Sequence, residues 1–322
     1  SAGVSAATGT LPMSQRNHLS TAPANLAPAA PDALPASVLA PLARIDPYLD
    51  EFIRAANLPV NLRDAILYSL LGPGKRIRPL LCLHSFRALG GSDEARALPA
   101  AAAVEMVHAF SLIHDDLPGL DNDDLRRGRP TLHKHAGEAM AILAGDSLLT
   151  LSFTILIDRY EPAVAAFMAR ELAAGTNGMI AGQIYDTLGG FAGTPTPEQR
   201  LELIHTNKTG ALIRAACRMG ALAAGAGPAT LQGISDYADA IGLMFQIVDD
   251  VLDVTQTSEH LGKKSGKDID AGELTYPGVM GIEASRRRVA QLHQAALTAL
   301  RPMGDASEPL AHLAGYLAAR TR

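Results

Sequence analysis

The hydrophobic and polar positions from about Val38 onward follow the pattern of one helix after another. Alanine and leucine dominate, runs of alternating β-branched residues are nearly absent, and glycine or proline separates the segments. The stretches TPEQ (196–199) and SDEA (92–95) carry signals that begin helices. The sequence therefore predicts an all-α fold of about ten helices, in a single domain over residues 39–322.

The first 38 residues have a different composition, rich in alanine, proline, serine and threonine. They show no sustained hydrophobic period and little charge, so they cannot bury enough apolar surface to offset the entropy of ordering. We expect residues 1–38 to form a flexible tail in front of the folded domain.

The apolar segment Ala139–Ile157 is long enough to cross a bilayer. Asp146 lies near its middle, however, where an acid costs about 2.5–3.5 kcal/mol on insertion scales. A helix that is apolar on all sides is also what the centre of a large bundle requires. We therefore favour a buried central helix and expect no membrane span.

Composition narrows the classes of function. The 322 residues are 48% hydrophobic and carry a net charge of −5, which argues against a nucleic acid partner, because such a partner requires a basic stripe. Cys82 and Cys217 both lie inside apolar runs and form no CxxC motif. Two reduced, buried thiols favour a reducing compartment, and we expect a cytoplasmic protein.

Two predicted helices carry carboxylate clusters. At 100° per residue, each of two sets lies within about 100° around its helix: Gln246, Asp249, Asp250 and Asp253; and Glu105, His108, Leu112, Asp115 and Asp116. Like charges at this spacing repel and destabilise a helix. A solvated face would explain one such stripe, but two stripes in one all-helical chain point to a shared purpose.

The loop after the second of these helices adds charge. Pro118 and Gly119 end the helix, so Asp121 lies on the loop. Asp123 and Asp124 receive no role beyond a solvated loop or support of the neighbouring ligands. His114 falls outside the acidic stripe, and we expect it to be structural.

Carboxylates in this number suit a hard cation such as Mg²⁺, which is commonly shared between one or two carboxylates and a substrate phosphate. Lysine and arginine, which bind phosphate as a point charge and as a bidentate fork, occur in four groups. These are Lys75, Arg76 and Arg78; Arg126, Arg127 and Arg129; Lys208; and Lys263, Lys264 and Lys267. They suffice for two polyphosphate groups, one held through metal ions and one held by cations directly.

The motifs, taken in order, resemble the trans-prenyl diphosphate synthases, and specifically the bacterial type of farnesyl diphosphate synthase. They are GKRIRP, DDLPGLD with RRGRPTLH, AILAGDSL, GQIYD, HTNKTGALI, FQIVDDVLD, GKKSGKD and TYP. The resemblance covers the chain from about Leu42 to its end. It implies an antiparallel helix bundle around a deep central cavity, in a homodimer.

The resemblance also implies roles for residues. It assigns about three substrate-bridged Mg²⁺ ions to Asp115, Asp116 and Asp121 on one wall and to Asp249 and Asp253 on the opposite wall. The allylic diphosphate would be held with the help of Arg126, Lys208 and Lys263. Isopentenyl diphosphate would be held by Lys75, Arg78, His108 and Arg127. Thr209 and Gln246 would face the allylic cation.

The implied chemistry explains such a layout. Ionisation of the allylic C–O bond leaves a carbocation and a diphosphate anion, which metal ions and cations neutralise. An apolar cavity must exclude water, because water would quench the cation. The resemblance suggests that the departing diphosphate removes the final proton, so no side-chain base is required.

Product length is open between C15 and C20. In the family, bulk just before the first aspartate cluster limits the chain, and here Phe110 and Ser111 stand five and four residues before Asp115. An aromatic residue at the fifth position resembles the bacterial C15 pattern. An ideal helix, however, places Ser111 about 40° from Asp115 and Phe110 about 140° away, so the C15 expectation depends on the resemblance.

One position departs from the family pattern. Glu273 precedes TYP, where the family usually has lysine, and it changes the local charge by two units beside the expected diphosphate. The nearest alternative is a geranylgeranyl diphosphate synthase. An inactive subunit of a heteromeric synthase is a second alternative, although such subunits tend to lose an aspartate motif, and a terpene cyclase would not need GKRIRP.

Overall fold

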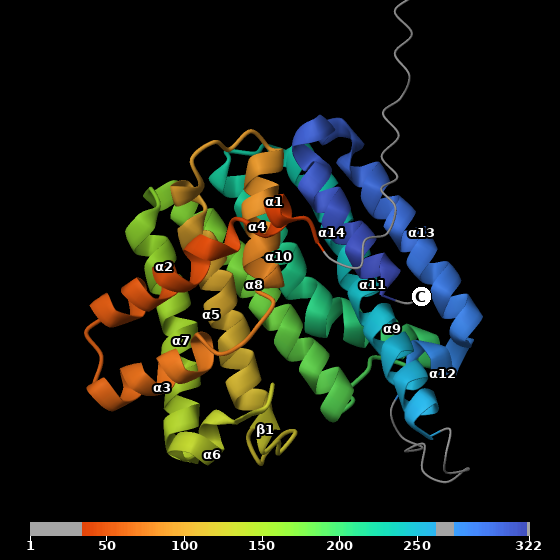
Figure 1. Ribbon diagram of the computed structural model, residues 1–322, viewed down its shortest axis with the longest axis horizontal. Coiled ribbons are helices and arrows are strands. Elements are labelled where there is room, and N and C mark those ends of the chain that lie inside the picture. The colour runs from red at the N-terminus through yellow and green to blue at the C-terminus, as the bar shows by residue number, and fades with distance from the viewer. Residues whose placement is uncertain (1–33, 262–273, 321–322) are drawn as a thin grey trace, which may run out of the picture.

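The structure, a computed structural model, describes residues 34–261 and 274–320, and of residues 256–261 the backbone alone. The described residues form a helical bundle, which confirms the predicted all-α class (Figure 1). The α-helices are α1 Ala36–Leu39, α2 Leu42–Ala55, α3 Val60–Leu70, α4 Ile77–Ala88, α5 Leu98–Asp115, α6 Leu132–Ala136, α7 Glu138–Arg159, α8 Pro162–Thr187, α9 Pro197–His205, α10 Ala211–Ala223, α11 Pro228–Leu261, α12 Tyr276–Met280, α13 Ile282–Leu300 and α14 Glu308–Ala319. Short 3₁₀ helices cover Glu94–Arg96 and Arg301–Ser307, and a π-helix covers Thr206–Gly210.

Helix α5 runs through the interior of the bundle. Thirteen of its eighteen residues are buried, and they face every side of the helix. Helices α4, α7 and α10 pack against it. The apolar sequence of this segment is therefore explained by its central place, and its carboxylate end is held where the surrounding helices fix it.

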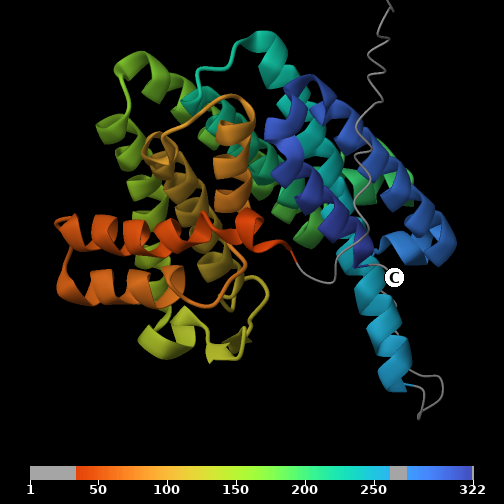
Figure 2. The ribbon, with the colours of Figure 1, turned by 45° about the horizontal axis from the view of Figure 1, so that its top comes forward.

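Helix α10 connects the two halves of the core. It packs against α4 and α8 on one side and α11 on another. Its buried side chains belong to two hydrophobic clusters, one around α5 and α7 and one around α11, α13 and α14. Figure 2 shows the first group of helices on one side of the molecule and the second group on the other.

Helix α7 was expected to be buried on all sides, and that expectation is wrong. Ala144 and Leu148 are fully buried, but Ile142, Leu143 and Ile157 are 44%, 57% and 65% exposed. By length and composition, α7 is the one helix of the described residues that could cross a membrane. It packs against α3, α5 and α6, so one face contributes to the core while the other presents apolar side chains outward.

The packed part of the chain includes residues that the sequence analysis places in the tail. Val38 is 1% exposed, and its carbonyl lies 2.8 Å from Nε2 of the buried His84.

The predicted helix start at TPEQ is confirmed, because Thr196 and Gln199 form a reciprocal capping box at the beginning of α9.

Candidate active site

The end of α5 and the loop that follows it bring two predicted carboxylates together. The amide of Asp121 donates to the carbonyl of Asp115 at 2.9 Å, so the loop folds back on the helix end. Burial raises the pKa of Asp115 to about 6, and burial is also the main cause that raises the pKa of Asp121. The neighbouring positive charges therefore do not offset the cost of burying the negative charge of either carboxylate.

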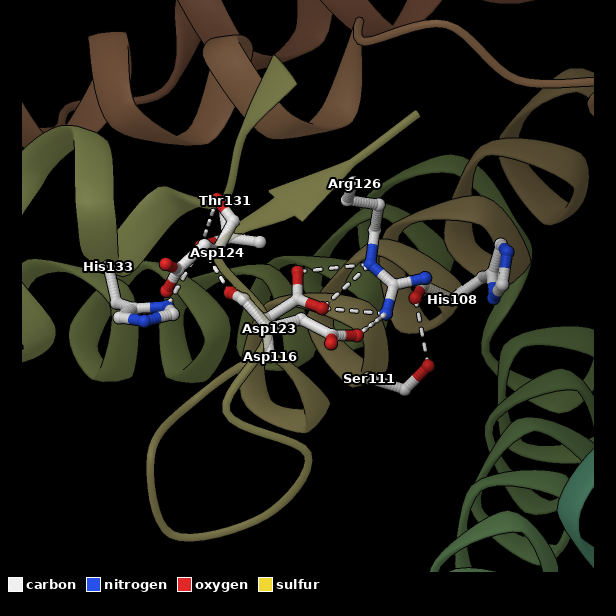
Figure 3. Close-up of polar contacts among 8 residues, drawn as sticks. All are labelled: His108, Ser111, Asp116, Asp123, Asp124, Arg126, Thr131 and His133. Atoms are coloured by element: carbon white, nitrogen blue, oxygen red, sulfur yellow. Dashed lines mark hydrogen bonds and ion pairs between the residues drawn. The ribbon is translucent and has the colours of Figure 1, made fainter. Parts of the chain in front are cut away.

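Asp116 has a different environment from its neighbour. Its carboxylate is buried and accepts two hydrogen bonds from Arg126 Nε, at 2.8 and 3.0 Å, while Nη2 lies 2.6 Å from Oδ1 (Figure 3). The sequence predicts a metal-binding role for Asp116 and a diphosphate-binding role for Arg126, and in the structure these two side chains pair with each other. Direct metal binding by Asp116 stays a prediction.

Arg126 belongs to a hairpin that the helical pattern did not predict. Strands β1 (Leu125–Arg126) and β2 (Arg129–Pro130) pair antiparallel around Arg127 and Gly128, which have φ of 52° and 77°. Two successive positive φ values suit a tight hairpin turn.

Asp123 and Asp124 hold this hairpin in place, which gives them a structural role. Oγ1 of Thr131 donates to the carbonyl of Asp123 at 2.8 Å, and the Thr131 amide donates to the carbonyl of Asp124 at 3.0 Å. The Asp124 carboxylate also pairs with Lys134 at 2.8 Å. Figure 3 shows the contacts of Thr131 with Asp123 and Asp124 beside the Asp116–Arg126 pair.

Four arginines surround His108 beneath the hairpin. Burial, and then the charges of Arg78, Arg127, Arg126 and Arg76, lower the pKa of His108 well below its usual value. Burial also lowers the pKa of Arg78 to about 10, and its Nε is buried without a hydrogen-bond partner among the described residues. Such an excess of donors and positive charge makes this an anion site.

Arg76 is buried beside that site, and no individual role for it was predicted from the sequence. Its guanidinium donates to Asp46 at 2.8 Å, to Glu105 at 2.9 Å and to the carbonyl of Gly72 at 3.1 Å. Its φ of 49° is left-handed, a conformation that a non-glycine residue adopts at some cost. Lys75 is exposed beside it, and Arg127 donates to the carbonyl of Pro73 in the same turn.

The second carboxylate cluster lies on α11. Burial raises the pKa of Asp249, which pairs with Arg320 at 3.4 Å and is close enough to Lys75 for that charge to oppose the rise. Asp253 is exposed one turn further along the helix. Asp250 instead faces the protein, where its Oδ2 lies 3.1 Å from His205 Nε2 and accepts from the Tyr276 amide at 2.9 Å.

A π-helix carries Lys208 and Thr209 between α8 and α11. A Cβ at Gly182 of α8 or at Gly242 of α11 would overlap the π-helix backbone, so both glycines permit its close approach. Thr209 donates to Gln246, which brings that predicted pair together. Such π-helical segments are frequent at functional sites.

Lys208 also contacts a carboxylate that the sequence analysis did not select. Its Nζ lies 2.6 Å from Asp186 Oδ2, on α8. Asp186 is close enough to Asp121 to contribute to the raised pKa of that group. Asp186 belongs to the GQIYD motif, but its pairing with Lys208 could not be inferred from spacing along the chain.

A cavity of about 440 Å³ extends from these charged groups into the bundle. Lys208, Thr209, Asp115, Arg78 and His108 line its polar part. Its apolar part is lined by Phe110, Leu112, Leu120, Met179, Ile180, Ile184 and Leu188, with Ser111 and His114 beside them. Phe110 thus reaches the cavity wall despite its angle on an ideal helix.

The donor set fits a magnesium ion that is shared with a substrate. The available donors are carboxylate oxygens, and three of these carboxylates, Asp115, Asp121 and Asp249, have raised pKa values. No three His, Cys, Asp or Glu side chains among the described residues form a complete cage. Mg²⁺ commonly takes its remaining ligands from phosphate and water. Lys263 and Glu273, which the sequence analysis also placed here, lie outside the described residues.

A family model described as polyprenyl synthetase matches residues 59–304. The chain belongs to the polyprenyl synthetase family. It is a prenyltransferase, and members of this family generally depend on Mg²⁺. The matched residues include both carboxylate clusters and the four arginines around His108.

Individual relatives cover most of the chain. It is 46% identical over 270 residues, 81% of this chain and 75% of the relative, to geranylgeranyl pyrophosphate synthase 11, chloroplastic, of Arabidopsis thaliana. It is 45% identical over 271 residues, 81% and 73% of the two chains, to the heterodimeric geranylgeranyl pyrophosphate synthase large subunit 1, chloroplastic, of the same plant. The apo structure of an FPP/GFPP synthase from Zymomonas mobilis is 31% identical with a TM-score of 0.76, covering 88% of this chain and 99% of that one.

Proposed function

We propose that the protein condenses isopentenyl diphosphate with allylic diphosphates and produces geranylgeranyl diphosphate. One observation carries the proposal. Carboxylates with raised pKa values and the arginines that surround His108 flank the same end of a largely apolar cavity. This arrangement can hold two diphosphates, one through metal ions and one through direct cations, with an isoprenoid chain between helices.

The allylic diphosphate belongs on the side of Asp115, Asp121, Asp249 and Asp253, which would hold Mg²⁺. The ions supply Lewis-acid stabilisation of the departing diphosphate when they are bound. Lys208 assists from the π-helix, held by Asp186. Arg126, fixed by Asp116, provides a preorganised positive charge that needs no rearrangement during the reaction.

Isopentenyl diphosphate belongs on the side of Lys75, Arg78, His108 and Arg127. His108 is neutral there, so it can donate one hydrogen bond to a phosphate oxygen without adding charge. Thr209 lines the cavity and donates to Gln246. Water exclusion by the apolar wall would protect the allylic cation until the new C–C bond forms.

The product assignment follows the relatives, which are named as geranylgeranyl synthases at 45–46% identity. A C15 product is the second candidate, and Phe110 favours it because its ring stands in the wall of the cavity. The farnesyl product that the sequence predicts therefore stays a prediction. Incubation of the purified protein with isopentenyl and dimethylallyl diphosphates and Mg²⁺ distinguishes the two. A C20 product supports the proposal, a C15 product overturns the length, and no product favours an inactive subunit.

We also propose a homodimer in the cytoplasm. The exposed apolar face of α7, which includes Ile142, Leu143 and Ile157, is a surface that a second copy could cover. One relative is named as part of a heterodimer, so a different partner is the alternative. The buried, free thiols of Cys82 and Cys217 suit a reducing compartment. Molar mass in solution tests the dimer.

A further inference from the structure

Two aromatic rings stand together in the wall of the cavity. Phe110 and His114 are four residues apart on α5, so their side chains lie on the same face of the helix. Their ring centroids are 4.9 Å apart at an interplanar angle of 76°, and both rings line the cavity. The edge-to-face contact restricts where the Phe110 ring can point.

His114 is in turn fixed by the backbone of α7. Its Nε2 lies 3.1 Å from the carbonyl of Ile142. A Cβ at Gly145 would overlap the His114 ring, so the ring occupies the space that this glycine leaves open. The position of the Phe110 ring therefore depends on a residue of another helix.

We infer that His114 and Gly145 determine product length by positioning Phe110 across the cavity. This inference rests on the proposed function and adds two residues that control the room available to the isoprenoid chain. Without the His114 ring, Phe110 can turn into the vacated space beside α7, and the cavity becomes deeper. A side chain at Gly145 has the opposite effect, because it pushes the His114 ring toward Phe110 and the cavity.

The geometry predicts effects of opposite sign from two single changes. His114→Ala should increase the share of product that is at least one five-carbon unit longer than the wild-type product by roughly tenfold, the ratio expected for a small change in an apolar pocket. Gly145→Ala should shift the distribution toward shorter product. In the double variant the Gly145→Ala effect should vanish, because the ring through which it acts is absent.

A matched control separates this effect from general loss of packing. Gly175→Ala on α8 also inserts a Cβ into a tight helix contact, against Ala215, and neither residue lines the cavity. It should lower thermal stability without changing product length. The dependence on Mg²⁺ should be the same in all these variants, because none removes a proposed ligand.

The experiment compares product lengths of wild type and variants by chromatography, with the folded fraction measured by circular dichroism. A folded His114→Ala variant that makes the same distribution of product lengths as the wild type overturns the inference. If Gly145→Ala does not fold, the result for His114→Ala is sufficient by itself. If the wild type itself condenses nothing, the proposed function fails. A wild type that makes a defined product with unchanged variants defeats only the role of His114 and Gly145.

Discussion

Asp250 and His205 join α11 to the segment that carries Lys208. The carboxylate of Asp250 lies 3.1 Å from His205 Nε2, and His205 is the last residue of α9 before the π-helix. The same oxygen accepts from the Tyr276 amide at the start of α12, and the Tyr276 ring stacks on His205. Asp250, the second of the three aspartates in FQIVDDVLD, is thus a positioning residue.

Asp250→Asn should raise the KM for the allylic substrate severalfold, because it removes the negative charge that His205 and the Tyr276 amide share, and an amide NH2 in that position can accept from neither. Loss of a hydrogen bond to a charged acceptor should also lower the free energy of unfolding by about 1.5–3 kcal/mol. Asp239→Asn is a suitable control on the same helix, since Asp239 pairs with Arg214 at the surface. Equal kinetic effects of both changes would contradict this role.

Removal of one partner from the buried Arg76–Glu105 pair should be costly. Arg76→Met leaves Glu105 buried without its partner, which we expect to lower the free energy of unfolding by about 3–5 kcal/mol. Arg44→Met should cost less than about 1 kcal/mol, because Arg44 is half exposed where it pairs with Glu94. Urea unfolding of both variants gives the comparison, and similar losses would contradict it.

The same pair should matter for one substrate more than the other. Arg76 anchors the turn that carries Lys75 and the start of α4 that carries Arg78, so the conservative Arg76→Lys should raise the KM for isopentenyl diphosphate more than the KM for the allylic substrate. Steady-state kinetics with each substrate varied in turn measures this ratio. A uniform change in both KM values would indicate a general structural defect instead.

Asp115 should make the metal-free protein more stable at lower pH. Its pKa is raised to about 6 in the folded protein and is about 3.9 when unfolded, so the folded state binds the proton more tightly. This stabilisation is present at low pH and is lost as pH rises through about 6. Relative to Asp115→Asn, the wild type should gain on the order of 1 kcal/mol between pH 7.5 and 5. Parallel pH profiles from urea unfolding in chelator would refute the burial argument.

Arg320 should compete with metal ions for Asp249. Its guanidinium lies 3.4 Å from that carboxylate, at the end of α14. Arg320→Gln removes the competing charge, so the Mg²⁺ concentration at half-maximal rate should fall severalfold. Arg286→Gln, which loses a surface pair with Glu283, should leave it unchanged. An unchanged or higher Mg²⁺ requirement in Arg320→Gln would contradict the competition.

The sequence predicted the all-α class and the carboxylate clusters because both depend on spacing along single helices. Asp115 and Asp249 could be placed by the helical period alone. Which helix each face meets depends on packing, so the pairings of Asp116 with Arg126 and of Lys208 with Asp186 were not predicted. Phe110 shows the same limit, because a side chain several atoms long can reach a cavity that the angle of its Cα does not face.

Two features of the scaffold differ from what the sequence predicts or were not predicted from it. Helix α7 was expected to be buried on all sides because its composition is apolar, but composition does not distinguish a core from a surface that another chain covers. The hairpin at Arg127 and Gly128 escaped notice because its strands are only two residues each, too short for a period.

Both carboxylate clusters are proposed to act on the allylic diphosphate, and the arginines around His108 to hold the other substrate. The most direct measurement is the rate of diphosphate release from geranyl diphosphate in the presence of isopentenyl diphosphate and Mg²⁺. Asp115→Asn and Asp249→Asn should each lower this rate by at least about 10²–10³-fold, the scale for losing a group that stabilises developing charge. Binding of isopentenyl diphosphate should stay within about twofold of the wild type, since its proposed contacts are untouched. A variant that releases diphosphate at the wild-type rate would contradict the account.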